Sequence, residues 1–388
     1  MRHFGHIAPE VRQRLFFQEP CEFDADSPAR LLAAALGATL YSPATRPRLA
    51  DDVVKLAAHG VVSMVLCLED SIGDEDVPAA EENLVRQFTD LAARPDVELP
   101  LLFIRVRVPE QIPDLVSRMG PAVRLLSGFV MPKFTEESGT PFLEALAAAE
   151  SASGHRLFGM PVLESPELLY RESRVETLEG ISRAVDKYRD RVLALRLGVT
   201  DFCSSYGLRR ASDMTAYDVQ IVANVIGDVV NMLGRADGTG FTVTGPVWEY
   251  FRVQERMFKP QLRRSPFLEG KAEELREALI EHAMDGLLRE IALDQANGLL
   301  GKTCIHPTHV LPVHALSVVS HEEFCDAQDI LRPERGGGGV LRSAYTNKMN
   351  EVKPHRAWAE RTMLRAEIFG VAREDVGFVE LLAAGIPG

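Results

Sequence analysis

Short apolar segments rich in β-branched residues alternate with longer stretches of helical period along most of the chain. This alternation is typical of βα units, in which each strand leads into a helix and the strands run parallel. Eight such strands can be counted, and eight βα repeats within about 280 residues predict a TIM (β/α)8 barrel. The expected strands are 38–42, 62–69, 101–108, 126–132, 156–164, 192–199, 241–245 and 299–306.

Helical periods fill the stretches between these strands. In the segment 213–233, Val219, Val222, Ile226 and Val229 share one stripe, and Ser212 or Asp213 is the expected N-cap. The expected helices are 47–59, 78–93, 139–152, 174–189, 213–233 and 271–297.

The chain divides into three parts on this pattern: an N-terminal extension, 1–37, the barrel, 38–315, and a C-terminal arm, 316–388. The glycine run 336–339 breaks regular structure and indicates a joint within the arm. The segment 353–368 beyond it is expected to be helical. Such an arm must bury its apolar face, which favours a homo-oligomer, and a trimer or hexamer would fit.

Composition excludes several classes of function. The chain has 388 residues and a formal net charge of −13, which argues against a general nucleic-acid binder and against an anionic membrane surface as partner. Its five cysteines are scattered and form no CxxC pair, so neither a disulfide framework nor a thiolate zinc site is indicated. No apolar run reaches the length of a membrane span. We therefore expect a cytoplasmic protein.

Charged or titratable residues follow six of the eight predicted strands. In a TIM barrel the active site lies at the C-terminal ends of the strands, so groups at these positions are candidates for catalysis. Any single one could instead be a helix cap or a solvated loop residue; their coincidence favours a site. The residues are Glu69, Asp70, Arg105, Arg107, Lys133, Glu164, Asp201 and His306.

Carboxylates without thiolates or a close histidine pair favour a hard cation. Magnesium needs only one or two protein carboxylates, and Glu164 with Asp201 suits that role. Arg105 and Arg107 share parity on one strand, so both are expected to point inward, where a guanidinium would bind a carboxylate. A salt bridge at the rim, to Glu69 or Asp70, is the alternative for Arg107 and, less strongly, for Arg105.

Two other motifs are weaker. The GKT at 301–303 resembles the end of a phosphate-binding loop, but position 296 is Ala296 instead of glycine, and the segment leads into a strand. The histidines of 306–321 could suggest zinc, yet their spacing matches no standard site, and Pro307 and Pro312 interrupt any shared helical face.

Ordered motifs along 38–368 resemble the citrate lyase beta-subunit family, which includes malyl-CoA and citramalyl-CoA lyases and belongs with the HpcH/HpaI aldolases. The resemblance implies that Glu164 and Asp201 bind magnesium, that Arg105 contacts the substrate, and that Asp70 and Glu69 support bound water or substrate. The motifs are LYSPATRPR at 40–48, CLEDS at 67–71, RVR at 105–107, MPK at 131–133, PVLES at 161–165, LGVTDF at 197–202, GKTCIHP at 301–307 and NKMNEVKPHRAWAE at 347–360.

The resemblance also implies that the segment around Glu351 enters the active site of a neighbouring subunit as an acid or base, and that Lys133 and His306 surround the site. This chain departs from the family pattern at Cys67, usually aspartate, and at Arg107, usually asparagine. Arg107 therefore suggests a second carboxylate or a phosphate on the substrate.

Together these features predict a magnesium-dependent carbon–carbon bond lyase. Retro-aldol or retro-Claisen cleavage, or the reverse condensation, would proceed through a metal-stabilised enolate of a small carboxylate or an acyl thioester. Lys133 is expected to act as a charged partner, with a Schiff base as the alternative. Two other interpretations stay open: a phosphoenolpyruvate-type barrel enzyme, and a degenerate barrel used as an interaction module.

Overall fold

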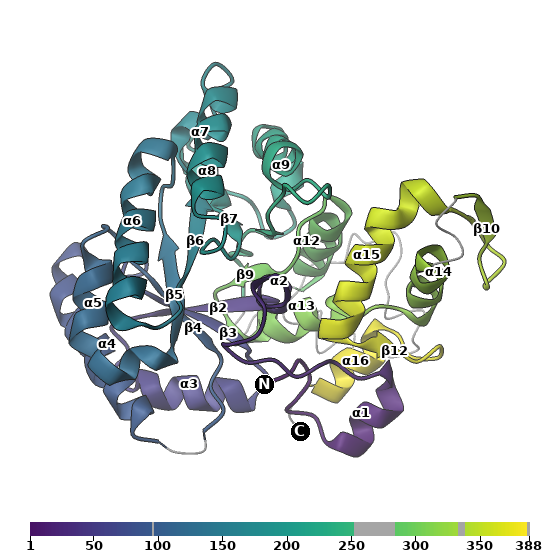
Figure 1. The fold of residues 1–388 in the computed structure, drawn as a ribbon, viewed down its shortest axis with the longest axis horizontal. Helices are drawn as coiled ribbons and strands as arrows, with labels where there is room; N and C mark the ends of the chain where they lie inside the picture. Colours follow the sequence, from purple (N-terminus) through teal and green to yellow (C-terminus); the bar gives the residue numbers. More distant parts are fainter. Residues whose placement is uncertain (95–96, 252–283, 333–337, 386–388) are drawn as a thin grey trace.

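Eight parallel strands form one sheet in the order β8-β7-β6-β5-β4-β3-β2-β9 in the computed structural model, which describes residues 1–94, 97–251, 284–332 and 338–385 (Figure 1). A parallel bridge between Gly245 and Lys302 joins the two edges, β8 and β9, and closes the barrel. The predicted TIM barrel is confirmed, with shorter strands than expected. They are β2 (Ala38–Pro43), β3 (Ser63–Cys67), β4 (Leu101–Arg105), β5 (Leu126–Met131), β6 (Phe158–Leu163), β7 (Leu195–Leu197), β8 (Val243–Thr244) and β9 (Lys302–Cys304).

Both faces of the barrel strands are buried, which explains their continuous apolar sequences. Side chains alternate between the two faces: Phe103 packs inside the barrel, and its neighbour Ile104 packs against the outer helices. Burial of both sets fixes the register, because a slip of one residue would exchange them.

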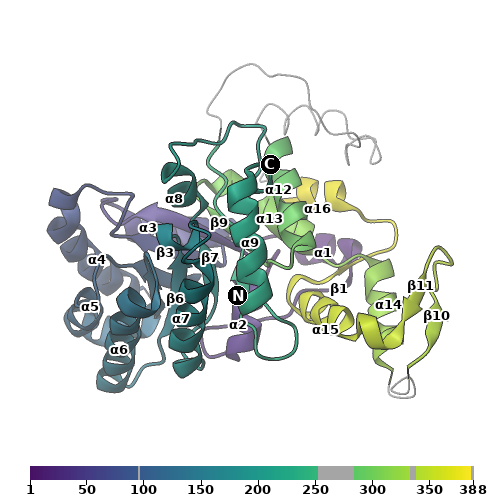
Figure 2. The same cartoon turned by 90° about the horizontal axis from the view of Figure 1, so that it is seen from above.

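Helices cover the outside of the barrel (Figures 1 and 2). One boundary prediction was wrong: the helix expected to begin near Ser212 begins at Gln220, because Thr215 forms a capping box with Asp218 around a separate 3-10 turn. Of the predicted helix 271–297, residues 271–283 lie outside the described residues. The helices are α3 (Leu49–Ala58), α4 (Val77–Ala92), α5 (Gln111–Met119), α6 (Glu136–Ser153), α7 (Arg174–Lys187), α8 (Val199–Ser204), α9 (Gln220–Leu233), α12 (Asp285–Ala296) and α13 (Val310–Ser317).

The N-terminal extension closes the floor of the barrel. It contains α1 (Pro9–Leu15), β1 (Phe16–Gln18) and α2 (Ala29–Ala35). Leu32 of α2 and Phe369 from the C-terminal arm belong to the same buried cluster as the interior residues Val65 and Phe103. The N-terminal ends of the strands are therefore covered, and the opposite ends form the mouth.

The C-terminal arm packs beside the barrel, away from β4, β5 and β6 (Figures 1 and 2). The helix predicted at 353–368 is confirmed as α15, and β1 pairs with β12, which ties the arm to the N-terminal extension. No helix in the described ranges is long and apolar enough to cross a membrane. The elements are α14 (His321–Leu331), β10 (Val340–Arg342), β11 (Met349–Glu351), α15 (Val352–Phe369), β12 (Val371–Ala372) and α16 (Phe378–Gly385).

A buried ion network joins the last strand to the helix before it. As expected, the GKT segment enters a strand, β9, and its Lys302 donates to Glu290 at 2.8 Å and to Asp294 at 2.7 Å, both on α12. Glu290 also accepts from Arg210 at 2.7 Å, and Asp294 accepts from the Tyr217 hydroxyl. Because both carboxylates lie one helical turn apart, they face the same lysine.

Replacing Lys302 by methionine should lower the free energy of unfolding by about 3–5 kcal/mol, because two buried carboxylates lose a shared cation. Urea titration of the full chain measures this change. Lys187→Met is the matched control, since the Lys187 side chain is 62% exposed. Equal stability of the two variants would contradict a stabilising role for the network.

Candidate active site

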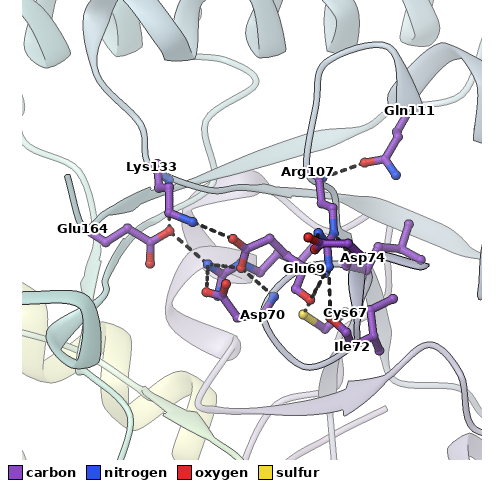
Figure 3. A network of polar contacts seen from close by, with 11 residues as sticks. Cys67, Glu69, Asp70, Ile72, Asp74, Arg107, Gln111, Lys133 and Glu164 are labelled. Carbon is purple, nitrogen blue, oxygen red and sulfur yellow. Dashed lines mark hydrogen bonds and ion pairs between the residues drawn. The ribbon is translucent and has the colours of Figure 1, made fainter. Parts of the chain in front are cut away.

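The mouth of the barrel brings together residues from four consecutive strands. Glu69 and Asp70 follow β3, Arg105 ends β4, Lys133 follows β5 and Glu164 follows β6. Figure 3 shows Glu69, Asp70, Lys133 and Glu164 facing one another. The structure thus assembles five of the residues that strand-end placement singled out.

Arg105 is the centre of this cluster. Its Nη2 lies 2.7 Å from Glu69 Oε2, 2.9 Å from Glu164 Oε1 and 3.4 Å from Asp70 Oδ2. The Arg105 side chain is 12% exposed, and its Nε has no hydrogen-bond partner among the described residues. A buried guanidinium with a free donor beside the mouth is suited to bind an anionic oxygen.

Lys133 holds the same carboxylates from the other side. Its backbone N–H donates to Glu164 Oε1 at 2.9 Å, and its Nζ donates to Glu69 Oε1 at 2.9 Å. The backbone at Lys133 has a φ of +47°, which a non-glycine residue adopts at some energetic cost. This conformation lets one residue contact both carboxylates.

Burial dominates the electrostatics of Glu164. It raises the pKa of Glu164 to about 7; the charge of Arg105 opposes this shift and the charge of Asp201 adds to it. The carboxyl is therefore poised between protonated and ionised at neutral pH.

Glu69 and Asp70 titrate as a coupled pair. Burial alone would raise the pKa of Glu69, but the hydrogen bond from Asp70 and the cations Arg105 and Lys133 lower it to about 2. Burial and the adjacent Glu69 raise the pKa of Asp70 to about 6. Asp70 therefore holds the proton of this pair and can exchange it near neutral pH, because its side chain is 58% exposed.

Glu164 and Asp201 form the candidate metal site. Asp201 lies in the first turn of α8, three residues after Gly198, and a Cβ at Gly198 would come within 2.4 Å of Glu164 Oε2. Glycine thus allows β7 to approach the glutamate. Within the described residues, the hydrogen bonds to Glu164 reach Oε1, so Oε2 is available as a ligand.

The charges of the cluster also fit a cation. The carboxylates of Glu69, Asp70 and Glu164 contact the two cations of Arg105 and Lys133, and Asp201 adds a further negative charge beside Glu164. A divalent cation between hard oxygen donors would balance this excess, and magnesium requires no more than one or two protein carboxylates. The described residues contain no group of three or more metal-ligating side chains, so waters and substrate would complete the coordination.

The Arg107 side chain does not have the inward orientation that strand parity predicted. Strand β4 ends at Arg105, so strand alternation does not extend to position 107. The Arg107 guanidinium donates to the carbonyls of Leu68, Glu69 and Ile72 and pairs with Asp74 (Figure 3). Arg107 therefore holds the loop that carries Glu69 and Asp70. This position at the rim is close to the alternative prediction, a salt bridge to one of those two residues.

Two other predicted residues lie apart from the cluster. Glu351 ends β11 in the C-terminal arm, where its backbone N–H donates to His355, and the arm lies away from β4–β6 of its own barrel (Figures 1 and 2). His306 follows β9 and stacks on Phe251 with ring centroids 4.6 Å apart. A role for Glu351 in a neighbouring subunit stays a prediction.

Residues on the opposite strands were not singled out in the sequence. Tyr41 of β2 and Arg196 of β7 also project into the barrel, and the Arg196 guanidinium lies 5.4 Å from the centroid of the Tyr41 ring. A signal for Arg196 was present: it is one charged residue inside the otherwise apolar run 192–199. The strand-end rule does not reach it, because Arg196 lies in the middle of β7.

Comparisons with known proteins assign the family. A model described as a C-C bond lyase of the TIM-barrel fold matches residues 30–371. The chain therefore belongs to the C-C bond lyase family, which confirms the predicted enzyme class, a carbon–carbon lyase. A search of curated proteins found no match.

Solved structures share the fold at low sequence identity. Protein CitE from Mycobacterium tuberculosis, in complex with magnesium, acetoacetate and coenzyme A, is 20% identical over 86% of this chain and 99% of that chain, with a TM-score of 0.52. Haloferax volcanii malate synthase, in a magnesium/glyoxylate complex, is 15% identical over 71% of this chain and 73% of that chain, with a TM-score of 0.50. At these identities the likeness establishes the fold.

Ionisation of Glu164 in the metal-free protein should oppose folding. Its folded-state pKa is about 7 against an ordinary value of 4.5, so between these pH values the unfolded chain has released a proton that the folded protein retains. The contribution of Glu164 to the free energy of unfolding should therefore fall by about 1–3 kcal/mol as the pH rises through that window. Urea titrations in EDTA should show a shallower fall for Glu164→Gln than for Glu144→Gln, an exposed control; parallel curves would contradict the shift.

Proposed function

We propose that this protein is a magnesium-dependent lyase that breaks or forms a carbon–carbon bond next to a carboxylate. The observation that carries the proposal is the cluster at the mouth, where buried Arg105 lies between Glu69 and Glu164, and Asp201 approaches the same glutamate. Membership of the C-C bond lyase family supports it. So do the magnesium, acetoacetate and glyoxylate in the two structures that share the fold.

Glu164 and Asp201 would hold the magnesium ion. When bound there, magnesium supplies positive charge that stabilises the negative charge developing on a substrate oxygen during cleavage or condensation. Binding requires Glu164 to lose its proton, so metal affinity should increase as the pH rises toward neutrality.

Arg105 would orient the substrate. Its Nε is buried without a partner in the described part of the chain, so a carboxylate or carbonyl oxygen arriving at the mouth gains a donor that is already in place. Glu69 and Glu164 hold the guanidinium at Nη2, which limits its movement when the substrate binds.

Asp70 is the candidate acid or base. A catalytic group works best when its pKa lies near the working pH, and the pKa of Asp70 is raised to about 6 by burial and by Glu69. Its carboxyl is half exposed at the mouth, so it can take a proton from a substrate hydroxyl or return one to carbon.

A cavity of about 760 Å³ beside β2 would accommodate a longer acyl chain. Among the described residues, it is lined by β2, by α3 and by the segment that follows β9, and its lining includes apolar Leu40 and Val310 as well as the basic side chain of Lys55. This volume is ample for a ligand the size of a cofactor. We therefore include acyl thioesters among the substrates.

A test of this function is proton exchange at the carbon that becomes nucleophilic. In D2O, the methyl protons of pyruvate should exchange in the presence of the protein and magnesium, and EDTA should stop the exchange. Asp70→Asn should slow it at least about 100-fold, and Glu164→Gln should weaken magnesium binding at least about tenfold by calorimetry. Glu144→Gln is the control. Exchange at the same rate with and without magnesium would overturn the proposal.

Lys133 should not form a Schiff base. The hydrogen bond to Glu69 raises the pKa of the Lys133 ammonium, which keeps the amine protonated and unreactive. Incubation with pyruvate and borohydride should therefore leave the mass of the intact protein unchanged. Covalent labelling at Lys133 would show that the carbanion is stabilised by an imine.

A further inference from the structure

Arg196 lies inside the barrel, one layer below Glu164. Arg196 on β7 pairs in register with Val162 on β6, and Glu164 follows Val162 by two residues on the same face. Only 1% of the surface of Arg196 is exposed. A permanent positive charge is therefore buried beneath the mouth.

The described residues give this charge no anionic partner. Its Nη2 donates to Thr303 Oγ1 at 2.7 Å, and its Nη1 donates to Thr39 Oγ1 at 3.4 Å and to the Met160 sulfur at 3.8 Å. The Nε has no acceptor within the described ranges. Buried arginines elsewhere in the molecule do pair with carboxylates: Arg105 with Glu69 and Glu164, for example. Because guanidinium does not lose its proton, the uncompensated charge is energetically unfavourable.

The neighbours of Arg196 on one side of the barrel interior are polar. Thr244 of β8 lies beside Arg196 in register, and its hydroxyl also lacks a partner within the described residues. Thr303 and Tyr41, which both contact Arg196, are half-buried. The interior on the other side is apolar, with Phe103 and other core residues.

We propose that Arg196 binds a second carboxylate of the substrate at the floor of the mouth, so that the enzyme selects dicarboxylates. This proposal rests on the proposed function, in which Arg105 and magnesium take the first carboxylate. A carboxylate carries one negative charge, which matches the single cation, whereas a phosphate would bring nearly two. Its oxygens would accept from the free Nε of Arg196 and from the Thr244 hydroxyl.

Matched ligands test the proposal. Malate and lactate are both 2-hydroxy acids, and malate has the additional carboxylate. Calorimetry on the magnesium-loaded full chain should show malate binding at least about tenfold more tightly than lactate. Arg196→Met should weaken malate about 10- to 100-fold and leave lactate within about twofold, while Arg196→Lys should retain part of the preference. Arg183→Met, on an exposed arginine, is the control.

Stability provides a second readout, because removal of an uncompensated buried charge should raise the melting temperature of ligand-free Arg196→Met. If the wild type binds malate and lactate equally tightly, the proposed subsite at Arg196 is wrong, but the proposed function stands. The same conclusion follows if Arg196→Met weakens the affinity for both ligands equally. If wild type with magnesium binds neither ligand, the subsite and the proposed function both fail.

Discussion

The position of Arg105 between Glu69 and Glu164 is the interaction on which the site depends. The three residues come from β3, β4 and β6, and only a closed sheet of parallel strands brings these ends to one mouth. The charge of Arg105 opposes the rise in the pKa of Glu164 that burial causes, and it helps to keep Glu69 ionised. Two features keep these groups in contact. Arg107 holds the loop that carries Glu69, and the positive φ of Lys133 lets that residue contact both Glu69 and Glu164.

The cluster contains more carboxylates than cations, and this imbalance prepares it for a ligand. Without a metal, the excess is reduced by protons, which is why the pKa of Glu164 is raised by burial to about 7 and that of Asp70 to about 6. A bound cation would replace the proton on Glu164. The proton on Asp70 can then move independently, because the cations Arg105 and Lys133 keep its neighbour Glu69 ionised. In the proposed function, metal binding and proton transfer therefore involve different carboxylates.

The sequence predicted the eight strands, their order and five of the mouth residues, because strand polarity determines where their ends meet. It did not predict the orientation of Arg107, since parity holds only while the strand continues, and β4 ends two residues earlier. It also missed the floor formed by α2: the run of small apolar residues 33–35 gives no indication of which surface it covers. The Lys302 network depends on a pairing between α12 and β9 that spacing alone does not reveal.

The barrel interior is divided into two halves, and this division determines how deep a ligand can bind. Strands β3 to β6 line it with apolar side chains such as Val65 and Phe103, while β2, β7, β8 and β9 contribute Thr39, Arg196 and other polar groups. Since α2 covers the floor, a ligand that binds these polar groups would have to enter from the mouth. Interior residues of a TIM barrel usually pack against one another and maintain stability. Here a charged interior residue, Arg196, lies one layer below Glu164, and under the proposed role substrate selection would be encoded within a strand as well as in the loops.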